Sequence, residues 1–101
     1  MIIKFSVDDD VYELDMQRIL NTEAIAVQKV TGMTYDEWLN ACDEGDPGAI
    51  TALVWIAMKR KRPELRYSDV EFPLREVWAN REYEGIEEPE DPTPPAEAAS
   101  D

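Results

Sequence analysis

The segment from Ala49 to Val70, AITALVWIAMKRKRPELRYSDV, constrains the fold more than any other part of the chain. Asp46 and Pro47 precede it and favour a helix start. An aspartate side chain accepts the free N–H groups of a first turn, and a proline at the first helical position loses no hydrogen bond. Apolar residues then fill almost every position as far as Met58. A helix that is apolar nearly all round must be covered from several sides, so the sequence predicts a central core helix over 47–62.

This segment turns abruptly basic, and it holds half of the positive charge of the chain: Lys59, Arg60, Lys61, Arg62 and Arg66. Such a cluster is compatible with nucleic-acid binding or nuclear targeting. Helix termination is the favoured interpretation, because cations at a helix C-terminus are stabilised by about 0.3–1 kcal/mol each. Pro63 then makes the end definite, since the residue before a proline is pushed out of helical geometry. We therefore expect these cations to cap the helix and to pair with acidic neighbours.

Acidic residues dominate the charge of the chain, with 23 acidic against 10 basic side chains and a net charge of -13. The stretch GIEEPEDPTPPAEAASD, residues 85–101, has no basic residue, four prolines and only Ile86 as a sizeable hydrophobe. Such a composition buries too little apolar surface to offset the entropy of ordering. The sequence predicts one globular domain, 1–84, followed by a disordered, acidic, proline-rich tail, 85–101. The tail would supply solubility, or act as a repulsive shield or a partner-binding arm.

The first residues have the pattern of a β-hairpin. IIKFSV alternates and is β-branched, which places Ile3, Phe5 and Val7 on one face of a strand. Three aspartates then form a turn candidate, and VYEL can return as a second strand. We predict a hairpin over 2–15, which must pack on helices because an isolated hairpin is only marginally stable.

Three further helices are predicted, over about 22–31, 35–43 and 73–83. The first places Ile25, Ala26 and Val30 on a shared side and ends at Gly32. The second begins with a reciprocal capping pattern, Thr34 to Glu37, and carries an apolar face made of Tyr35, Trp38, Leu39 and Cys42. For the last, a start at Ser68 or at Pro73 is possible, and Pro73 is preferred. The fold class is thus mainly α with an N-terminal β-hairpin (α+β), with about four short helices packed around the helix at 47–62.

Residues that carry reaction chemistry are scarce. The chain has no histidine, its single cysteine (Cys42) has no partner for a nucleophilic dyad, a disulfide or a thiolate zinc site, and no glycine-rich phosphate loop is present. Asp8–Asp10 and the acids at 43–46 could bind a divalent cation, but neither group fits the twelve-residue calcium loop. We predict a protein that is not an enzyme and uses no metal or cofactor.

The cellular compartment is predicted from the cysteine content and from the lack of targeting signals. The lone cysteine suits the reducing cytoplasm, and the amino terminus lacks the layout of a signal peptide. The apolar run is also too short for a membrane span, which needs roughly 20 apolar residues.

Aromatic residues are the candidates for partner binding. Three tryptophans are many for a domain of this size, and tryptophan is over-represented at interface hot spots. Packing in the core is the competing interpretation, because most of the aromatic residues fall on predicted core faces. The predicted partner-binding residues are Trp38, Trp55, Met58 and Trp78, with Trp55 and Trp78 favoured.

One block resembles a known family. ALVWIAM at 52–58, followed by basic residues, Pro63, Glu64-Leu65, Tyr67 and Ser68-Asp69-Val70, is similar to the tail assembly chaperones of long-tailed (siphovirus-type) bacteriophages. In that family an A-L-V-W-(aliphatic)-A helix is followed by a short polar stretch and an aromatic-x-D-V element. The segment TYDEW at 34–38 and the acidic tail are similar in style. The resemblance covers about residues 20 to 80 and leaves the hairpin unmatched.

The resemblance implies a small, non-catalytic protein of phage morphogenesis. It would bind the tape measure protein, help to recruit the tail tube protein, act in the host-cell cytoplasm and be absent from the mature virion. Self-association is a further partner prediction, whereas nucleic acid and membrane are not expected partners. Many members also exist in a longer, frameshifted form. The family supplies no catalytic residue.

Two alternatives belong to other classes. An acidic DNA mimic would inhibit a nucleic-acid-binding protein, and the net charge motivates it; the basic cluster at 59–66 and the position of the acids in a proline-rich tail count against it. A structural head–tail connector subunit is the second alternative, and it would be found in purified virions.

Overall fold

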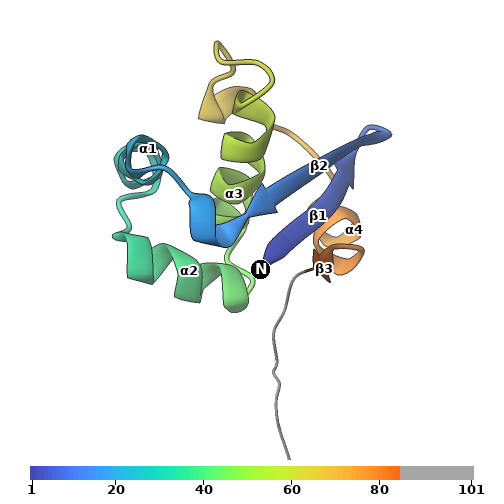
Figure 1. Cartoon of the computed structure of the whole chain (residues 1–101), viewed down its shortest axis with the longest axis horizontal. Coiled ribbons are helices and arrows are strands. Elements are labelled where there is room, and N and C mark those ends of the chain that lie inside the picture. Colours follow the sequence, from blue (N-terminus) through green and yellow to red (C-terminus); the bar gives the residue numbers. More distant parts are fainter. Residues whose placement is uncertain (85–101) are drawn as a thin grey trace, which may run out of the picture.

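The described part of the computed structural model, residues 1–84, is an α+β fold built around one buried helix (Figure 1). Helix α3 stands in the middle, with helices α1 and α2 packed on it and strand β2 crossing it. Helix α4 lies against strand β1. In chain order the elements are β1 (Ile2–Val7), β2 (Asp10–Asp15), α1 (Asn21–Thr31), α2 (Tyr35–Asp43), α3 (Pro47–Lys59), α4 (Leu74–Ala79) and β3 (Glu82–Glu84), with single 3-10 turns at Met16–Arg18 and Tyr67–Asp69.

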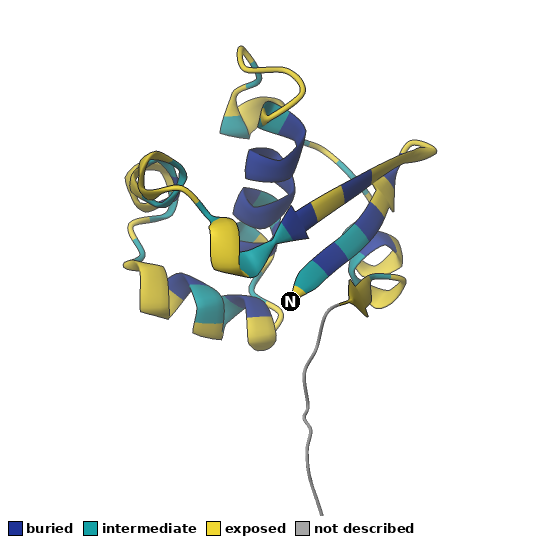
Figure 2. Cartoon of the chain, viewed as in Figure 1, coloured by how far each residue is buried: buried dark blue, intermediate teal, exposed yellow. Residues whose placement is uncertain are grey.

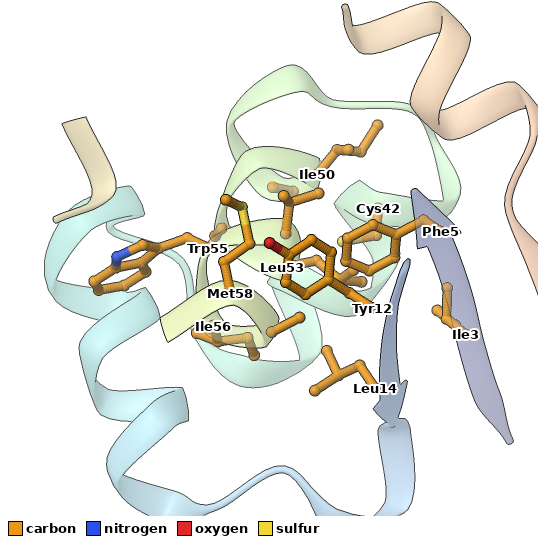
Figure 3. Packing of buried hydrophobic residues seen from close by; sticks show 14 of the residues in the cluster. Ile3, Phe5, Tyr12, Leu14, Cys42, Ile50, Leu53, Trp55, Ile56 and Met58 are labelled. Carbon is orange, nitrogen blue, oxygen red and sulfur yellow. The ribbon is translucent and has the colours of Figure 1, made fainter. Parts of the chain in front are cut away.

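The predicted hairpin is confirmed, and it belongs to a larger sheet. β1 pairs antiparallel with β2, with Phe5 opposite Tyr12, and the turn places Asp8 and Asp9 at positive φ. β3 then pairs antiparallel with the other edge of β1, which gives the strand order β2-β1-β3. The inward face of β1 and β2 is apolar, and Figure 3 shows Phe5 and Tyr12 side by side, stacked with their ring centroids 5.8 Å apart.

Helix α3 supplies half of the buried core. Every residue from Ala52 to Met58 is buried, as are Ala49 and Ile50, and Figure 2 shows the helix almost entirely in the buried colour. Its start follows the predicted signal, because Asp46 Oδ2 accepts a hydrogen bond from the Ala49 N–H (2.9 Å). The helix ends at Lys59, earlier than predicted. The backbone N–H groups of Lys61 and Arg62 both donate to the Met58 carbonyl, in a turn that precedes Pro63.

The loop after α3 folds back along the helix and is held there by its two aromatic residues. Trp55 Nε1 donates to the Leu65 carbonyl (2.9 Å), and Tyr67 Oη donates to the Gly48 carbonyl (3.1 Å). The rings of Trp55 and Tyr67 also meet edge to face, with centroids 5.8 Å apart. Figure 3 shows Trp55 on the side of α3 away from the hairpin. The block 52–70 is therefore one structural unit, in which a helix and its returning loop hold each other.

Most of the basic cluster contacts the chain itself. Arg60 forms a two-pronged ion pair with Glu23 of α1, at 2.7 and 2.8 Å, and its guanidinium also donates to the Arg18 carbonyl. This hydrogen bonding lowers the pKa of Glu23 below its usual value. The remaining cations with contacts lie over aromatic rings or on a carboxylate, in the pairs Lys59–Trp55, Lys61–Tyr12 and Arg66–Asp69.

Two predicted details differ from the structure. On α1 the buried residue is Val27, whereas Ile25 and Val30 are exposed, because α3 covers the face that carries Glu23, Ala26 and Val27. The predicted helix over 73–83 ends at Ala79, because β1 has an open edge that residues 82–84 occupy as a strand. The predicted disordered tail, 85–101, lies outside the described residues.

We expect Leu53→Ala to lower the free energy of unfolding by about 2–5 kcal/mol, because it removes a fully buried side chain from a helix that is covered on all sides. Ile25→Ala is the matched control and should change it by less than about 0.5 kcal/mol, since Ile25 is half exposed on α1. Urea unfolding followed by tryptophan fluorescence measures both. A large loss from Ile25→Ala would contradict the observed orientation of α1.

Glu23→Gln should lower stability by about 1 kcal/mol near neutral pH, because it removes the charged partner of Arg60 from a partly buried pair. The pKa of Glu23 is lowered in the folded state, so its contribution is present above about pH 4.5 and is lost as the pH falls further. Urea unfolding at pH 7 and pH 3.5 should therefore show a smaller pH dependence for the variant than for the parent. An equal pH dependence would contradict the role given to this pair.

Candidate functional site: an apolar groove beside β3

An apolar groove opens between helix α2 and the β3 edge of the sheet, with a volume of about 200 Å³. We call it the α2–β3 groove. Its floor belongs to the core, and its rim carries partly exposed side chains from five different elements or their ends. The lining residues are Met1, Ile3, Met16, Leu39, Cys42, Asp43, Leu53, Trp78 and Tyr83.

Helix α2 forms one wall of the groove. Thr34 and Glu37 cap its start reciprocally, as the sequence predicted, through N–H bonds of 3.3 and 2.9 Å. Leu39 and Asp43 lie four residues apart, so they share the face that lines the groove. Tyr35 continues this stripe by one more turn, is 42% exposed, and its hydroxyl lies 3.5 Å from the carbonyl of Met16. Tyr35 and Leu39 thus form a short apolar stripe that leads along α2 to the groove, and Asp43 ends it.

The opposite wall comes from the end of α4 and from β3. The register places Tyr83 directly opposite Ile3, so both side chains are on the groove side of the sheet. Arg81 lies between the two aromatic residues, with its guanidinium 4.1 Å from the Trp78 ring centroid and 5.4 Å from that of Tyr83. It also donates to the Trp78 carbonyl and the Tyr83 hydroxyl. Arg81 therefore holds this wall in place.

Trp78 extends the apolar surface beyond the groove. It also lines a second hollow of about 270 Å³, together with Gly45, Ile50, Leu74, Arg75 and Ala79. Gly45 has φ +83 between α2 and α3, a conformation that strains residues with a side chain, and it allows the tight connection beside this hollow. The half-buried Trp78 is thus shared by two adjoining apolar depressions.

Charge around the groove is mainly acidic on the α2 side. Asp43 lines the groove and is exposed, and within residues 1–84 it has no cation within salt-bridge distance. Glu44 follows it, and β3 carries Glu82 and Glu84, the latter paired with Lys4 on the other face of the sheet. Arg81 and Arg75 supply positive charge on the Trp78 side.

The four predicted partner-binding residues are not brought together. Trp38 is fully buried, with its Nε1 donating to the Ala49 carbonyl (2.9 Å), and Trp55 and Met58 are 6% and 7% exposed on α3. Trp78 is the one of the four that lines the groove, and partner binding by any of them stays a prediction. Leu39 was placed by sequence on the same core face as Trp38, and Asp43 was considered only as a possible cation ligand. Met1, Met16 and Tyr83 were missed; for Tyr83 the reason is that pairing of β3 with β1 leaves no local signal.

The floor of the groove includes the only thiol of the chain, that of Cys42. Burial, with the nearby Asp43 and Asp46 as smaller causes, raises the pKa of the Cys42 thiol to about 12, which leaves it a neutral, apolar floor residue. Within the described residues, no group of three or more histidine, cysteine or acidic side chains is arranged to hold a metal ion. No helix between residues 1 and 84 combines the length and apolarity required to cross a membrane.

Comparison of the chain with protein-family models, curated proteins and solved structures finds no match.

We expect Cys42 to react with a disulfide-type thiol reagent at pH 8 at least about a hundredfold more slowly in the folded protein than in urea, because little thiolate forms. Its pKa in the fold lies above the ordinary value of 9.0, so the stability gained by the neutral thiol is kept below pH 9 and lost as the pH rises toward 12. The chain has one cysteine, so absorbance of the released thiol reports on this site alone. Equal rates in buffer and urea would contradict the burial described above.

Proposed function

We propose that this protein is a non-catalytic tail assembly chaperone of a long-tailed bacteriophage, which binds the tape measure protein and assists assembly of the tail tube. The observation that carries the proposal is the block 52–70, whose residue order resembles that family. Its partners in this proposal are the tape measure protein and the tail tube protein, and its place of action is the host-cell cytoplasm.

The structure supports the proposal by giving the resembling residues a common physical role. ALVWIAM is the buried part of α3, Leu65 accepts the Trp55 hydrogen bond, and Tyr67 packs on Trp55. The Asp69 carboxylate accepts a hydrogen bond from the Arg66 N–H and pairs with the Arg66 guanidinium, which stabilises the 3-10 turn at Tyr67–Asp69. Since these residues depend on one another, their joint occurrence is a more specific signature than an apolar helix alone.

The surface also suits a chaperone. A protein that holds an apolar client needs an accessible apolar surface, and the α2–β3 groove with the adjoining hollow at Trp78 supplies one. The chain carries a net charge of -13, which keeps complexes dispersed by mutual repulsion. Six of the acidic residues follow β3 directly in the sequence, beyond the described residues.

The test is co-expression with a tape measure protein of a long-tailed bacteriophage. We expect the tape measure protein to become more soluble and to co-purify with a tagged copy of this protein, because its apolar surfaces are covered while it awaits assembly. Sedimentation and pull-down measure both effects. A chain truncated after residue 84 is a second sample, and it should still co-purify while the complex aggregates more readily.

Absence of co-purification together with unchanged solubility of the tape measure protein would overturn the proposal. Recovery of the protein from purified virions would also overturn it and would favour a structural connector subunit instead.

A further inference from the structure

We infer that the α2–β3 groove binds one amphipathic helix whose apolar face is flanked by basic residues. This inference rests on the proposed function for the need to hold a client, and it adds the surface and the class of segment that is held. Three features of the groove support this inference: its shape, the partly exposed apolar side chains at its rim, and its charge.

The shape of the groove fits a helix. Its α2 wall presents Leu39, Cys42 and Asp43. Tyr35 lies one turn before Leu39, outside the groove, on a helix of nine residues or about 13 Å. Two turns of a partner helix match this length, and apolar residues at i, i+3, i+4 and i+7 would meet such a wall. An extended segment would instead have to pair with β3, which has three residues and therefore offers few backbone hydrogen bonds.

Among residues 1–84, the side chains at the rim of the groove are mostly apolar and remain partly exposed. Met1 and Tyr83 are each 39% exposed, and Leu39, Met16 and Trp78 are half buried around a floor of fully packed core residues. Methionine side chains adapt to differently shaped partners, which suits a surface that accepts a helix rather than one fixed ligand. The half-buried Trp78 is the anchor, because tryptophan is enriched among residues that dominate binding energy.

The charge of the groove favours a partner helix with basic residues at its ends. Asp43 lines the groove without an ion-pair partner among residues 1–84, and Glu44 lies next to it at the end of α2. On the other side, Arg81 stacks on Trp78 and bonds with Tyr83, so part of its charge is engaged within the wall. Arg75 borders the second hollow. A lysine or arginine at the end of the bound helix would therefore be placed best beside Asp43.

The test uses the full chain and synthetic peptides of about 18 residues, long enough for measurable helicity. The first peptide has leucines at helical spacing in an alanine and glutamine background, with two lysines at each end. A second has the same composition with the leucines scattered, a third has glutamates at the ends, and a fourth has a central Pro-Gly that prevents a helix. Titration followed by tryptophan fluorescence gives Kd, and the reaction rate of Cys42 gives a second readout at the groove floor.

We expect the lysine-flanked helix to bind at least about tenfold more tightly than each of the other three peptides and to slow the reaction of Cys42 further. Leu39→Glu should weaken this binding by at least about tenfold, because it places a charge on the apolar wall. Asp43→Asn should weaken it by about threefold for the lysine-flanked peptide and leave the glutamate-flanked peptide no weaker. Ile25→Glu is the matched control on the exposed face of α1 and should change Kd by less than about twofold.

Circular dichroism verifies that each variant is folded, and Asp43→Asn keeps the test decisive if Leu39→Glu unfolds. Equal binding of the helical and Pro-Gly peptides would overturn the inference in favour of an extended segment, and equal loss from Leu39→Glu and Ile25→Glu would place the site elsewhere. Co-purification of the tape measure protein with the parent and with folded Leu39→Glu alike would overturn the groove inference and leave the proposed function intact. Selective peptide binding without co-purification of the tape measure protein would overturn the proposed function and leave the groove inference intact.

Discussion

Burial of α3 on all sides is the constraint on which the rest of this structure depends. The helix has no polar face between Ala52 and Met58, so no single neighbour can cover it. The hairpin, α1, α2 and the returning loop each take one side, and their own sequences supply one apolar face apiece. Burial of a large apolar side chain is worth about 1.5–3 kcal/mol, which makes this helix the main source of stability for a domain of this size.

The elements that cover α3 are held to it by polar interactions at the margin of the core. A buried tryptophan must find an acceptor for its N–H group, and two tryptophans use backbone carbonyls here. Trp38 of α2 donates to the Ala49 carbonyl of α3, and Trp55 of α3 donates to the Leu65 carbonyl of the returning loop. Each bond ties a covering element to α3. The pair Arg60–Glu23 does the same for α1 at the surface. Polar groups at the margin of the core thus fix the positions that non-directional apolar contacts leave free.

Local patterns in the sequence were sufficient for most of the fold. Asp46, Thr34 and Gly32 mark helix ends because capping acts within one turn, and alternation in β1 marks its buried face. The sequence of α1 alone does not determine which face of the helix is buried, because Ile25 and Val30 are as apolar as Val27. The position of α3 decides between these faces. Likewise β3 is a strand because β1 offers an edge, and the groove that depends on it has no local pattern.

The first strand of the chain is the middle strand of the sheet, and this has a consequence for the order of assembly. β1 and β2 are neighbours in the sequence, but the second edge of β1 can be paired only after residues 82–84 have been synthesised. That pairing spans nearly the whole described chain, so it is the contact of highest loop-closure entropy. The wall formed by Trp78, Arg81 and Tyr83 is consequently completed last. The α2–β3 groove needs both the first strand and the last described strand, so it is the last feature of the described structure that can form during synthesis.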